Sequence, residues 1–412
     1  MQQYMQRVIC HCDLNNFYAS VECVARPELA NIPLIVGGDV EKRHGIVLAK
    51  NQLAKAKGIK TGDTIWQALQ KEPNLVSVPP QFDLYMKYSK MVFNEYTNYT
   101  SKVEAFGPDE CWLDVTGSLN IFGSGRAIAD DIRTVVKEKT GLTLSVGVSF
   151  NKVFAKLAGD IATADSTLEI TKENFKKQLY HLDANNIMGI GRKTIQKLNA
   201  KRIMTIGDVA NACPDYLKRL LGKHGVIISN HARGIDYEHV REYVANREVK
   251  SVGHGLTAVR DLVNHNEAST LISYLAELVA NRMRKISVRG NGISLHLRNN
   301  KLGVISRQCK LTTSINSASQ ISNAAISLLK DNWDLSVPLR SLSIAVFDLS
   351  NNSLGTQSSM FDVSDVKSER LQSALDLIRL RHGNDKIIRA SLIENDYIMD
   401  KNDSEDFLPF LR

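Results

Sequence analysis

Residues 7–23, RVICHCDLNNFYASVEC, decide the fold. The stretch from Arg7 to Asp13 is short and β-rich and ends in a carboxylate, whereas NNFYASVEC has the apolar spacing of a helix. Alternation along the strand places Ile9, His11 and Asp13 on one face. We therefore expect a strand that carries Asp13 to the rim of a sheet, with a helix directly behind it.

A second acidic position lies in a later pair of short strands. A helical pattern over residues 83–100 precedes VEAF and ECWLDV, which the Gly107-Pro108 turn signal joins. A helix over 126–139 and a strand over 142–148 follow. The order β, α, insertion, α, β, β, α, β suits a ferredoxin-like antiparallel sheet interrupted by an insertion at 24–82, so we expect an α+β fold.

Length and composition indicate a globular protein of several domains. A chain of 412 residues suggests about two to four domains, and 43% hydrophobic with 23% charged residues is ordinary for a packed protein. No apolar stretch approaches the roughly 20 residues that span a bilayer, and MQQYMQR lacks the apolar run of a signal peptide. The six cysteines form no C-x-x-C pair, which argues against structural zinc and disulfides. We expect a cytoplasmic protein without a membrane segment.

Charge is unevenly distributed along the chain. The net charge is +8, and residues 241–310 hold twelve Lys or Arg against five Asp or Glu, whereas residues 361–412 hold eight against eleven. A basic block of this kind attracts polyanions such as nucleic acid. On charge alone, a solvated basic face is an equally good interpretation.

Residues 186–209 have the form of a helix-hairpin-helix, with helices expected on both sides of the turn Gly189-Ile190-Gly191. Backbone N–H groups at such a turn can point at a phosphate, although a plain helical hairpin needs glycine as well. The stretch that follows His231 is charged and lacks an apolar stripe, so we interpret it as a tether. Beyond it, helices and strands up to residue 350 predict a separate α+β unit that carries the basic block.

Asp13 and the adjacent pair Asp109 and Glu110 are the candidate catalytic residues. Neighbouring strands would bring them together, and clustered carboxylates repel one another unless cations neutralise them. Ligands that are all oxygen favour Mg²⁺ or Mn²⁺ over zinc. The alternative is that Asp109 and Glu110 simply occupy an exposed turn.

Three motifs in order resemble those of the Y-family DNA polymerases, which bypass damaged bases. Residues 13–22, DLNNFYASVE, resemble the first motif, in which an aspartate precedes an aromatic pair and A-S-V-E. Residues 106–111, FGPDEC, are similar to the second metal motif, and residues 145–158, SVGVSFNKVFAKLA, to the third, a strand followed by a helix that bears a lysine. The resemblance is to bacterial members, and both the polymerase IV and the polymerase V catalytic-subunit branches are open.

The resemblance implies a domain plan in the terms used for these enzymes. It comprises a palm at 1–23 and 83–170, fingers at 24–82, a helix-hairpin-helix thumb at 171–235, a linker at 236–249, an α+β little finger at 250–350 that binds DNA, and a tail at 351–412.

The resemblance also assigns roles to individual residues. Asp13, Asp109 and Glu110 match the catalytic carboxylates that hold two Mg²⁺ ions, for which Mn²⁺ can substitute, and the backbone carbonyl of Leu14 matches an extra ligand. Tyr18, next to Phe17 in the nucleotide site, matches the steric gate that excludes a ribose 2′-OH, with a core aromatic as the alternative. Further matches are Lys55 and Lys156 at the nucleotide triphosphate, and Gly189 and Gly191 at the DNA backbone.

The fingers depart from the usual pattern. Many members place an aromatic and an arginine where this sequence has Gln52 and Lys55. Lysine can still contact a phosphate, but as a point charge and not as a bidentate fork. Residues 51–56, NQLAKA, look closer to the polymerase V catalytic subunit than to polymerase IV.

The implied activity is template-directed, low-fidelity DNA synthesis past damaged bases, by attack of a primer 3′-OH on the α-phosphate of a dNTP. The implied substrates are primer-template DNA and a dNTP, and we expect a monomer. In the tail, Gln357, Met360 and Phe361 of QSSMF resemble the peptide by which bacterial polymerases bind the sliding clamp. The alternatives are another palm-type nucleotidyl transferase, such as a nucleotide cyclase, and a non-catalytic DNA-binding accessory protein of the same fold.

Overall fold

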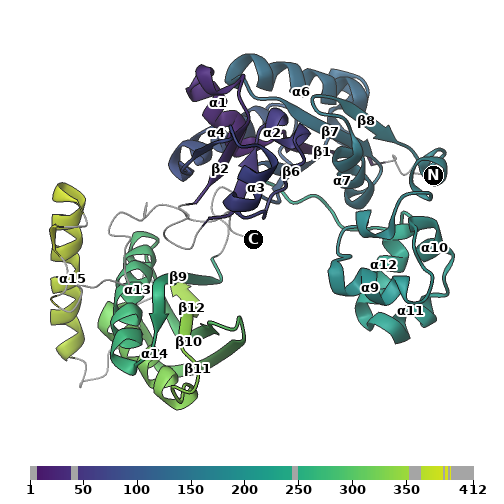
Figure 1. Ribbon diagram of the computed structural model, residues 1–412. Helices are drawn as coiled ribbons and strands as arrows, with labels where there is room; N and C mark the ends of the chain where they lie inside the picture. Colours follow the sequence, from purple (N-terminus) through teal and green to yellow (C-terminus); the bar gives the residue numbers. More distant parts are fainter. Residues whose placement is uncertain are drawn as a thin grey trace.

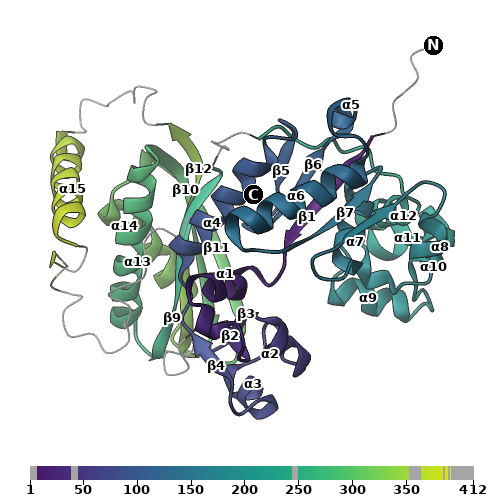
Figure 2. The same cartoon turned by 90° about the horizontal axis from the view of Figure 1, so that it is seen from above.

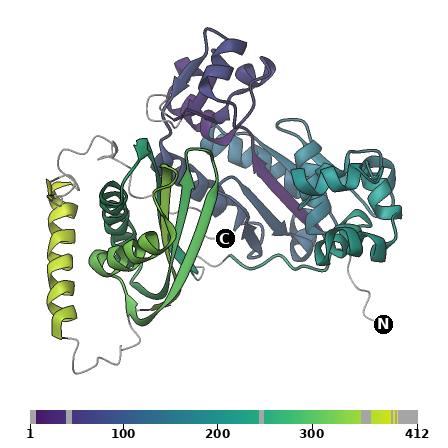
Figure 3. The ribbon, with the colours of Figure 1, turned by 60° about the horizontal axis from the view of Figure 1, so that its bottom comes forward.

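The computed structural model describes residues 7–38, 45–243, 249–351, 363–383, 386–387 and 390. The chain forms a central palm, with helical thumb and little finger at opposite ends of it (Figures 1 and 3). The α+β fold with a ferredoxin-like palm is confirmed. No helix in the described part of the chain is long and apolar enough to cross a membrane.

The palm is a five-stranded sheet in the order β5-β6-β1-β7-β8. Its strands are β1 (Ile9–Leu14), β5 (Val103–Ala105), β6 (Glu110–Asp114), β7 (Leu144–Ser149) and β8 (Thr167–Ile170), and its helices are α1 (Phe17–Ala25), α4 (Phe82–Tyr96), α5 (Leu119–Phe122), α6 (Gly125–Thr140) and α7 (Lys152–Ile161). Strand β1 pairs antiparallel with both β6 and β7. The central strand therefore carries Asp13 near its C-terminal end, at the rim of the sheet, as the sequence predicts.

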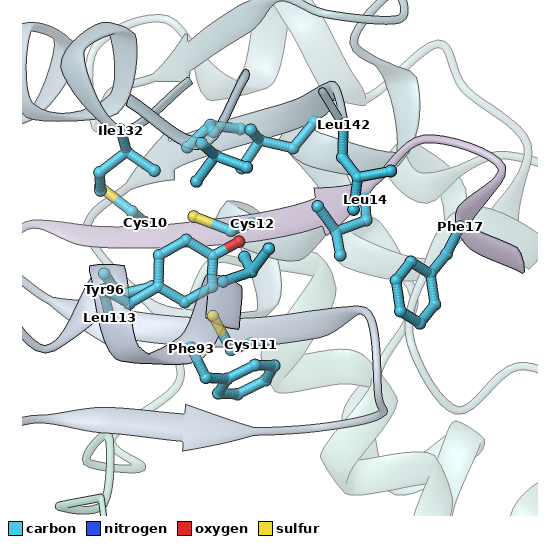
Figure 4. Packing of buried hydrophobic residues seen from close by; sticks show 14 of the residues in the cluster. Cys10, Cys12, Leu14, Phe17, Phe93, Tyr96, Cys111, Leu113, Ile132 and Leu142 are labelled. Carbon is cyan, nitrogen blue, oxygen red and sulfur yellow. The ribbon is translucent and has the colours of Figure 1, made fainter. Parts of the chain in front are cut away.

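Helices cover both faces of this sheet. On one face, α4 and α6 pack over the β1 residues Cys10 and Cys12, which are fully buried (Figures 2 and 4). On the other face, α7 lies almost in contact with the backbone of β7, because a Cβ at Gly147 would come within 2.0 Å of the Ala155 carbonyl oxygen. Glycine thus allows α7 to sit directly on the strands that carry the carboxylates. All six cysteines are free.

The fingers contain a second, three-stranded sheet in the order β3-β2-β4. Its strands are β2 (Leu34–Gly37), β3 (Val47–Lys50) and β4 (Val76–Val78), with helices α2 (Gln52–Ala56) and α3 (Ile65–Lys71) beside them. Ile35, Val47 and Ile65 belong to a small core of their own, whereas Leu34 and Val36 belong to the palm core. The fingers are therefore anchored to the palm through β2.

The thumb is made of short helices α8 (Phe175–Leu179), α9 (Arg192–Asn199), α10 (Ile206–Asn211), α11 (Pro214–Leu221) and α12 (Lys223–Ala232). The expectation of a full helix before Gly189 is wrong, because that segment is a single 3₁₀ turn, Ala184–Asn186. The backbone there bonds elsewhere: the Ala184 N–H donates to the Met204 carbonyl at 2.8 Å, and Asp183 bridges to Thr205.

The little finger is a four-stranded sheet in the order β11-β10-β12-β9, whose apolar residues pack against α13 and α14. The elements are β9 (Ser251–Leu262), α13 (His265–Lys285), β10 (Val288–Asn299), β11 (Val304–Ile315), α14 (Ala318–Asn332) and β12 (Leu339–Asn351). Sequence analysis missed β11 because this edge strand is exposed along most of its length and carries no apolar alternation.

A helix in the tail is another element that sequence analysis missed. Helix α15 (Val363–His382) lies beside α13 (Figure 1), where Arg284 binds both carboxylate oxygens of Asp376 at 2.5 and 2.8 Å. Arg379 pairs with Glu277 at 3.1 Å. Polar contacts attach this helix to α13, so the sequence has no clear apolar stripe that would predict it. Gln357, Met360 and Phe361 lie outside the described residues.

The described start of the linker is fixed to the palm, so its interpretation as a tether is wrong for residues 236–243. Lys152 and Glu104 form a buried ion pair, in which Lys152 Nζ lies 3.1 and 3.0 Å from the two carboxylate oxygens. The same Nζ also donates to Glu238 in the linker, at 3.2 Å. The Arg241 N–H donates to Glu104 at 3.0 Å, and Val240 is buried. The charged sequence gives no sign of this attachment, because Val240 is the one buried residue among 236–243, and Tyr243, whose ring centroid lies 6.5 Å from that of Phe93, is exposed.

Candidate active site

Strand pairing brings the predicted carboxylates to one place. In the β1–β6 ladder, Asp13 stands opposite Glu110. The Leu14 N–H donates to the Asp109 carbonyl at 3.1 Å, which continues the ladder into the turn. Residues almost a hundred positions apart in the sequence therefore share one end of the sheet.

Glu110 has cationic and polar neighbours that keep it ionised. Lys156 Nζ, from the α7 helix, donates to Glu110 Oε2 at 2.7 Å, and His11 Nε2 lies 3.4 Å from the same oxygen. Burial alone would raise the pKa of Glu110, but His11 and Lys156 outweigh it and lower the pKa to about 2. Lys156 also pairs with Asp160 at 3.3 Å, so it is already engaged without a nucleotide.

Asp13 and Asp109 are compensated less than Glu110, because the charge of Lys156 lowers their pKa values by less than burial and the neighbouring carboxylates raise them. Burial and the nearby charges of Glu110 and Asp109 raise the pKa of Asp13 to about 8. Burial, with the charge of Glu110, raises the pKa of Asp109 to about 6. Both carboxyl groups therefore lack positive charge that a cation would supply.

The side chains of Asp13, Asp109 and Glu110 have the chemical character of ligands for a divalent cation. Their donor atoms are carboxylate oxygens, which hard cations prefer, and two of the side chains are electrostatically unbalanced. Within the described ranges, no three His, Cys, Asp or Glu side chains are already arranged as a metal cluster. Lys156 holds Glu110 through Oε2 in this structure.

An aromatic stack lies beside the carboxylates. Asn16, in the left-handed conformation at φ 51°, turns the chain from β1 into α1. Phe17 is buried, and the Tyr18 ring stacks on Tyr85 with centroids 4.4 Å apart and planes inclined at 15°. Burial raises the pKa of Tyr18, and the charge of Asp109 adds to the rise.

Comparisons with known proteins identify the family of this chain. The model of the impB/mucB/samB family matches residues 12–160, and that of its C-terminal domain matches 249–360. The chain is 41% identical to DNA polymerase IV of Acetivibrio thermocellus over 95% of this chain and 98% of that protein. It is 33% identical to DNA polymerase IV 2 of Bacillus subtilis over 94% of both chains. The chain belongs to the Y-family of DNA polymerases.

A solved structure agrees at the level of the fold. The Y-family DNA polymerase chimera Dbh-Dpo4(243-245)-Dbh aligns with a TM-score of 0.74 at 24% identity, over 84% of this chain and 100% of that chain. The family and the near-full-length relatives make the chain a DNA-directed DNA polymerase of the lesion-bypass type. Both sequence relatives carry the polymerase IV name over nearly full length, which outweighs the likeness of residues 51–56 to the polymerase V catalytic subunit.

Sequence reasoning on this Y-family chain gave no role to Glu22. Its side chain is fully buried and accepts hydrogen bonds from the Tyr85 hydroxyl at 2.5 Å and from Gln81 at 3.0 Å. Arg26 pairs with it as well. Glu22 therefore fixes Tyr85, the ring on which Tyr18 stacks, and the available signal was an acidic residue in an otherwise apolar helix.

Other predicted site residues lie apart from the carboxylates. Lys55 is exposed on α2, and none of the hydrogen bonds or ion pairs found among the described residues joins it to Asp13, Asp109 or Glu110. In the thumb, Gly189 has φ 95° and its carbonyl accepts from His224 at 2.9 Å, while Gly191 caps the start of α9 without a side-chain bond.

Proposed function

We propose that Asp13, Asp109 and Glu110, with the Leu14 carbonyl, hold the divalent cations of nucleotide addition. The observation that carries this proposal is the β1–β6 ladder, which sets Asp13 opposite Glu110 next to Asp109. The raised pKa values of Asp13 and Asp109 support it, because a cation would favour their charged forms. We propose two Mg²⁺ ions, for which Mn²⁺ can substitute; when bound, they would stabilise the attacking and leaving oxygens of phosphoryl transfer.

Lys156 would neutralise the triphosphate of the incoming dNTP. Before a nucleotide binds, its ammonium forms ion pairs with Glu110 and Asp160 and is mostly shielded from water. These ion pairs could be replaced by one with the triphosphate. A triphosphate that arrives with its cations offers Lys156 a stronger anion than Glu110, and it releases Glu110 to the cluster. Lys55 would contact the same triphosphate from the fingers as a mobile point charge.

Tyr18 would select deoxyribose. Its ring cannot retreat, because Tyr85 stacks on one face and Phe82 meets it edge-on with centroids 6.0 Å apart. A ribose 2′-OH brought against a ring that is held in place would clash, whereas a 2′-hydrogen would fit. Phe17, buried beneath, holds the start of α1 in the palm core.

The remaining domains would hold primer-template DNA. We propose the division into palm, fingers, thumb, linker, little finger and tail at the boundaries given above. The hairpin at Gly189 and Gly191 would contact the DNA backbone, since the N-terminal N–H groups of α9 have no side-chain cap. The basic little finger would grip the duplex through its phosphates.

Three further proposals rest on the sequence. We propose that Gln357, Met360 and Phe361 dock on the sliding clamp, that the chain acts as a monomer, and that it works in the cytoplasm. The clamp peptide follows the last strand of the little finger, so a bound clamp would hold that domain close to DNA.

Primer extension by the purified full chain tests the cation site. We expect Asp109→Ala and Glu110→Ala to abolish dNTP addition at ordinary Mg²⁺, because each removes an anionic ligand. Glu138→Ala is the matched control, since Glu138 is an exposed acidic residue on α6, away from the strands of the site. Activity that survives Asp109→Ala or Glu110→Ala would rule out the proposed ligand set.

A further inference from the structure

A buried histidine beside the site lacks hydrogen-bond partners. His11, on β1 two residues before Asp13, is completely inaccessible to solvent. Over the part of the chain that the structure describes, neither of its ring nitrogens makes a hydrogen bond. A buried polar group without a partner is costly and rare in native proteins, so this arrangement needs a physical explanation.

Packing fixes the imidazole in a single place. Its ring meets the Trp112 ring edge-on, with centroids 5.3 Å apart. On the α7 side the fit is close, because a Cβ added at Gly159 would lie 3.0 Å from His11 Nδ1. Gly159 and Lys156 are three residues apart on α7 and so share one face of the helix. The same helix thus supplies the lysine and the glycine that the imidazole packs against.

The imidazole is directed at one oxygen of Glu110. His11 Nε2 lies 3.4 Å from Glu110 Oε2, just beyond a well-formed hydrogen bond, and Lys156 Nζ binds that same oxygen at 2.7 Å. Two donors therefore converge on Oε2, while the other carboxylate oxygen receives neither. While Lys156 binds Oε2, the His11 imidazole remains too far from this oxygen for a well-formed hydrogen bond.

We propose that His11 is a positioning residue that takes over Glu110 when Lys156 turns to the triphosphate. Its N–H then donates to Oε2, so that Glu110 keeps one orientation and presents Oε1 to the cation. This exchange gives His11 Nε2 the partner that it lacks in this structure, and it uses the close fit of the imidazole against Gly159. The inference rests on the proposed role of Glu110 as a ligand.

Two substitutions of His11 separate positioning from packing. His11→Phe keeps a ring against Trp112 but removes the donor, whereas His11→Gln keeps an N–H donor. We would measure Mn²⁺ affinity by electron paramagnetic resonance in the complex of the full chain with a dideoxy-terminated primer-template and the matching dNTP. Removing an outer partner of a metal ligand weakens metal binding by about 10- to 100-fold. We expect that loss for His11→Phe, with most of the affinity restored in His11→Gln.

A second measurement uses the unsubstituted protein and so does not depend on how a variant folds. With ¹⁵N-labelled histidine, the His11 Nε2 resonance should move as its hydrogen bond forms when dNTP and Mg²⁺ are added to the DNA complex. Unchanged His11 resonances would overturn the inference. Wild-type Mn²⁺ affinity in His11→Phe, or equal losses in both variants, would overturn it as well.

Glu110→Gln distinguishes failure of this inference from failure of the proposed function. If Glu110→Gln binds Mn²⁺ as tightly as the unsubstituted chain, Glu110 is not a ligand and both proposals fall. If Glu110→Gln loses affinity while His11→Phe does not, the metal site stands and only the role of His11 is refuted.

Discussion

Three carboxyl groups within one site have three different protonation behaviours. Glu110 is ionised because Lys156 and His11 face it, whereas Asp13 and Asp109 have raised pKa values. The difference arises from which neighbour each side chain meets, since all three are partly buried. The proposed cation would therefore stabilise mainly the ionised forms of Asp13 and Asp109.

The raised pKa values predict how the metal-free protein responds to pH. Asp13 titrates at about 8 in the folded chain and near 3.9 when unfolded, so the folded state binds more protons between about pH 4 and 8. The free energy of unfolding in EDTA should therefore fall as pH rises through this window. Urea denaturation at pH 5 and pH 8 measures the fall, and Asp13→Asn should make it shallower. An identical pH dependence in Asp13→Asn would contradict the assigned pKa.

The stacked position of Tyr18 predicts its effect on sugar selection. Tyr18→Ala should open space for a 2′-OH and reduce discrimination against ribonucleotides by about 10- to 200-fold, the range for one small group in a packed pocket. Tyr18→Phe keeps the ring and is the control. The ratio of kcat/KM for dNTP and rNTP is the measurement, and unchanged selectivity in Tyr18→Ala would exclude the gate.

At the residue scale, the sequence predicted which side chains meet but not how they pair. Asp13, Asp109, Glu110 and Lys156 were all identified from motifs. Three features could not be predicted, because they depend on distances between strands and helices that no spacing in the sequence encodes. They are the ion pair of Lys156 with Glu110, the unpartnered His11, and the hydrogen bonds of Glu22.

Helices and strands could be predicted from the sequence where their apolar residues form a single stripe that packs against one hydrophobic core. Strands β1 and β6 follow such patterns, and sequence analysis placed both. The edge strand β11 and helix α15 escaped it because their contacts are polar or their faces exposed. Tertiary context decides such elements, and local pattern does not reveal it.

The fixed start of the linker gives a prediction at this scale. Breaking a buried ion pair by removing one partner costs about 3–5 kcal/mol, so Lys152→Met should lower the free energy of unfolding by that order. It should also free residues 236–243, seen as faster hydrogen exchange at the Arg241 and Tyr243 amides, which donate to Glu104 and Ser101.

A surface ion pair provides the control for this prediction. Arg126 and Asp130 form an exposed pair on α6, and Arg126→Ala should cost no more than about 1 kcal/mol. Equal costs for Lys152→Met and Arg126→Ala, with unchanged exchange at Arg241, would show that the linker is not held in this way.

At the scale of the whole molecule, the palm joins the other units through different kinds of contact. The fingers share its core, the thumb continues from α7, and the linker is attached at the buried pair of Lys152 and Glu104. Composition predicted several domains, but not these attachments. They matter because the carboxylates lie at the end of the sheet that the fingers and α7 adjoin.

Anomalous diffraction from Mn²⁺ tests the account most directly. Crystals of the full chain with primer-template DNA and a non-hydrolysable dNTP should show two Mn²⁺ peaks about 3.5–4 Å apart, with Asp13, Asp109 and Glu110 all within bonding distance. Peaks elsewhere, or a structure in which Asp13 binds neither ion, would contradict the account.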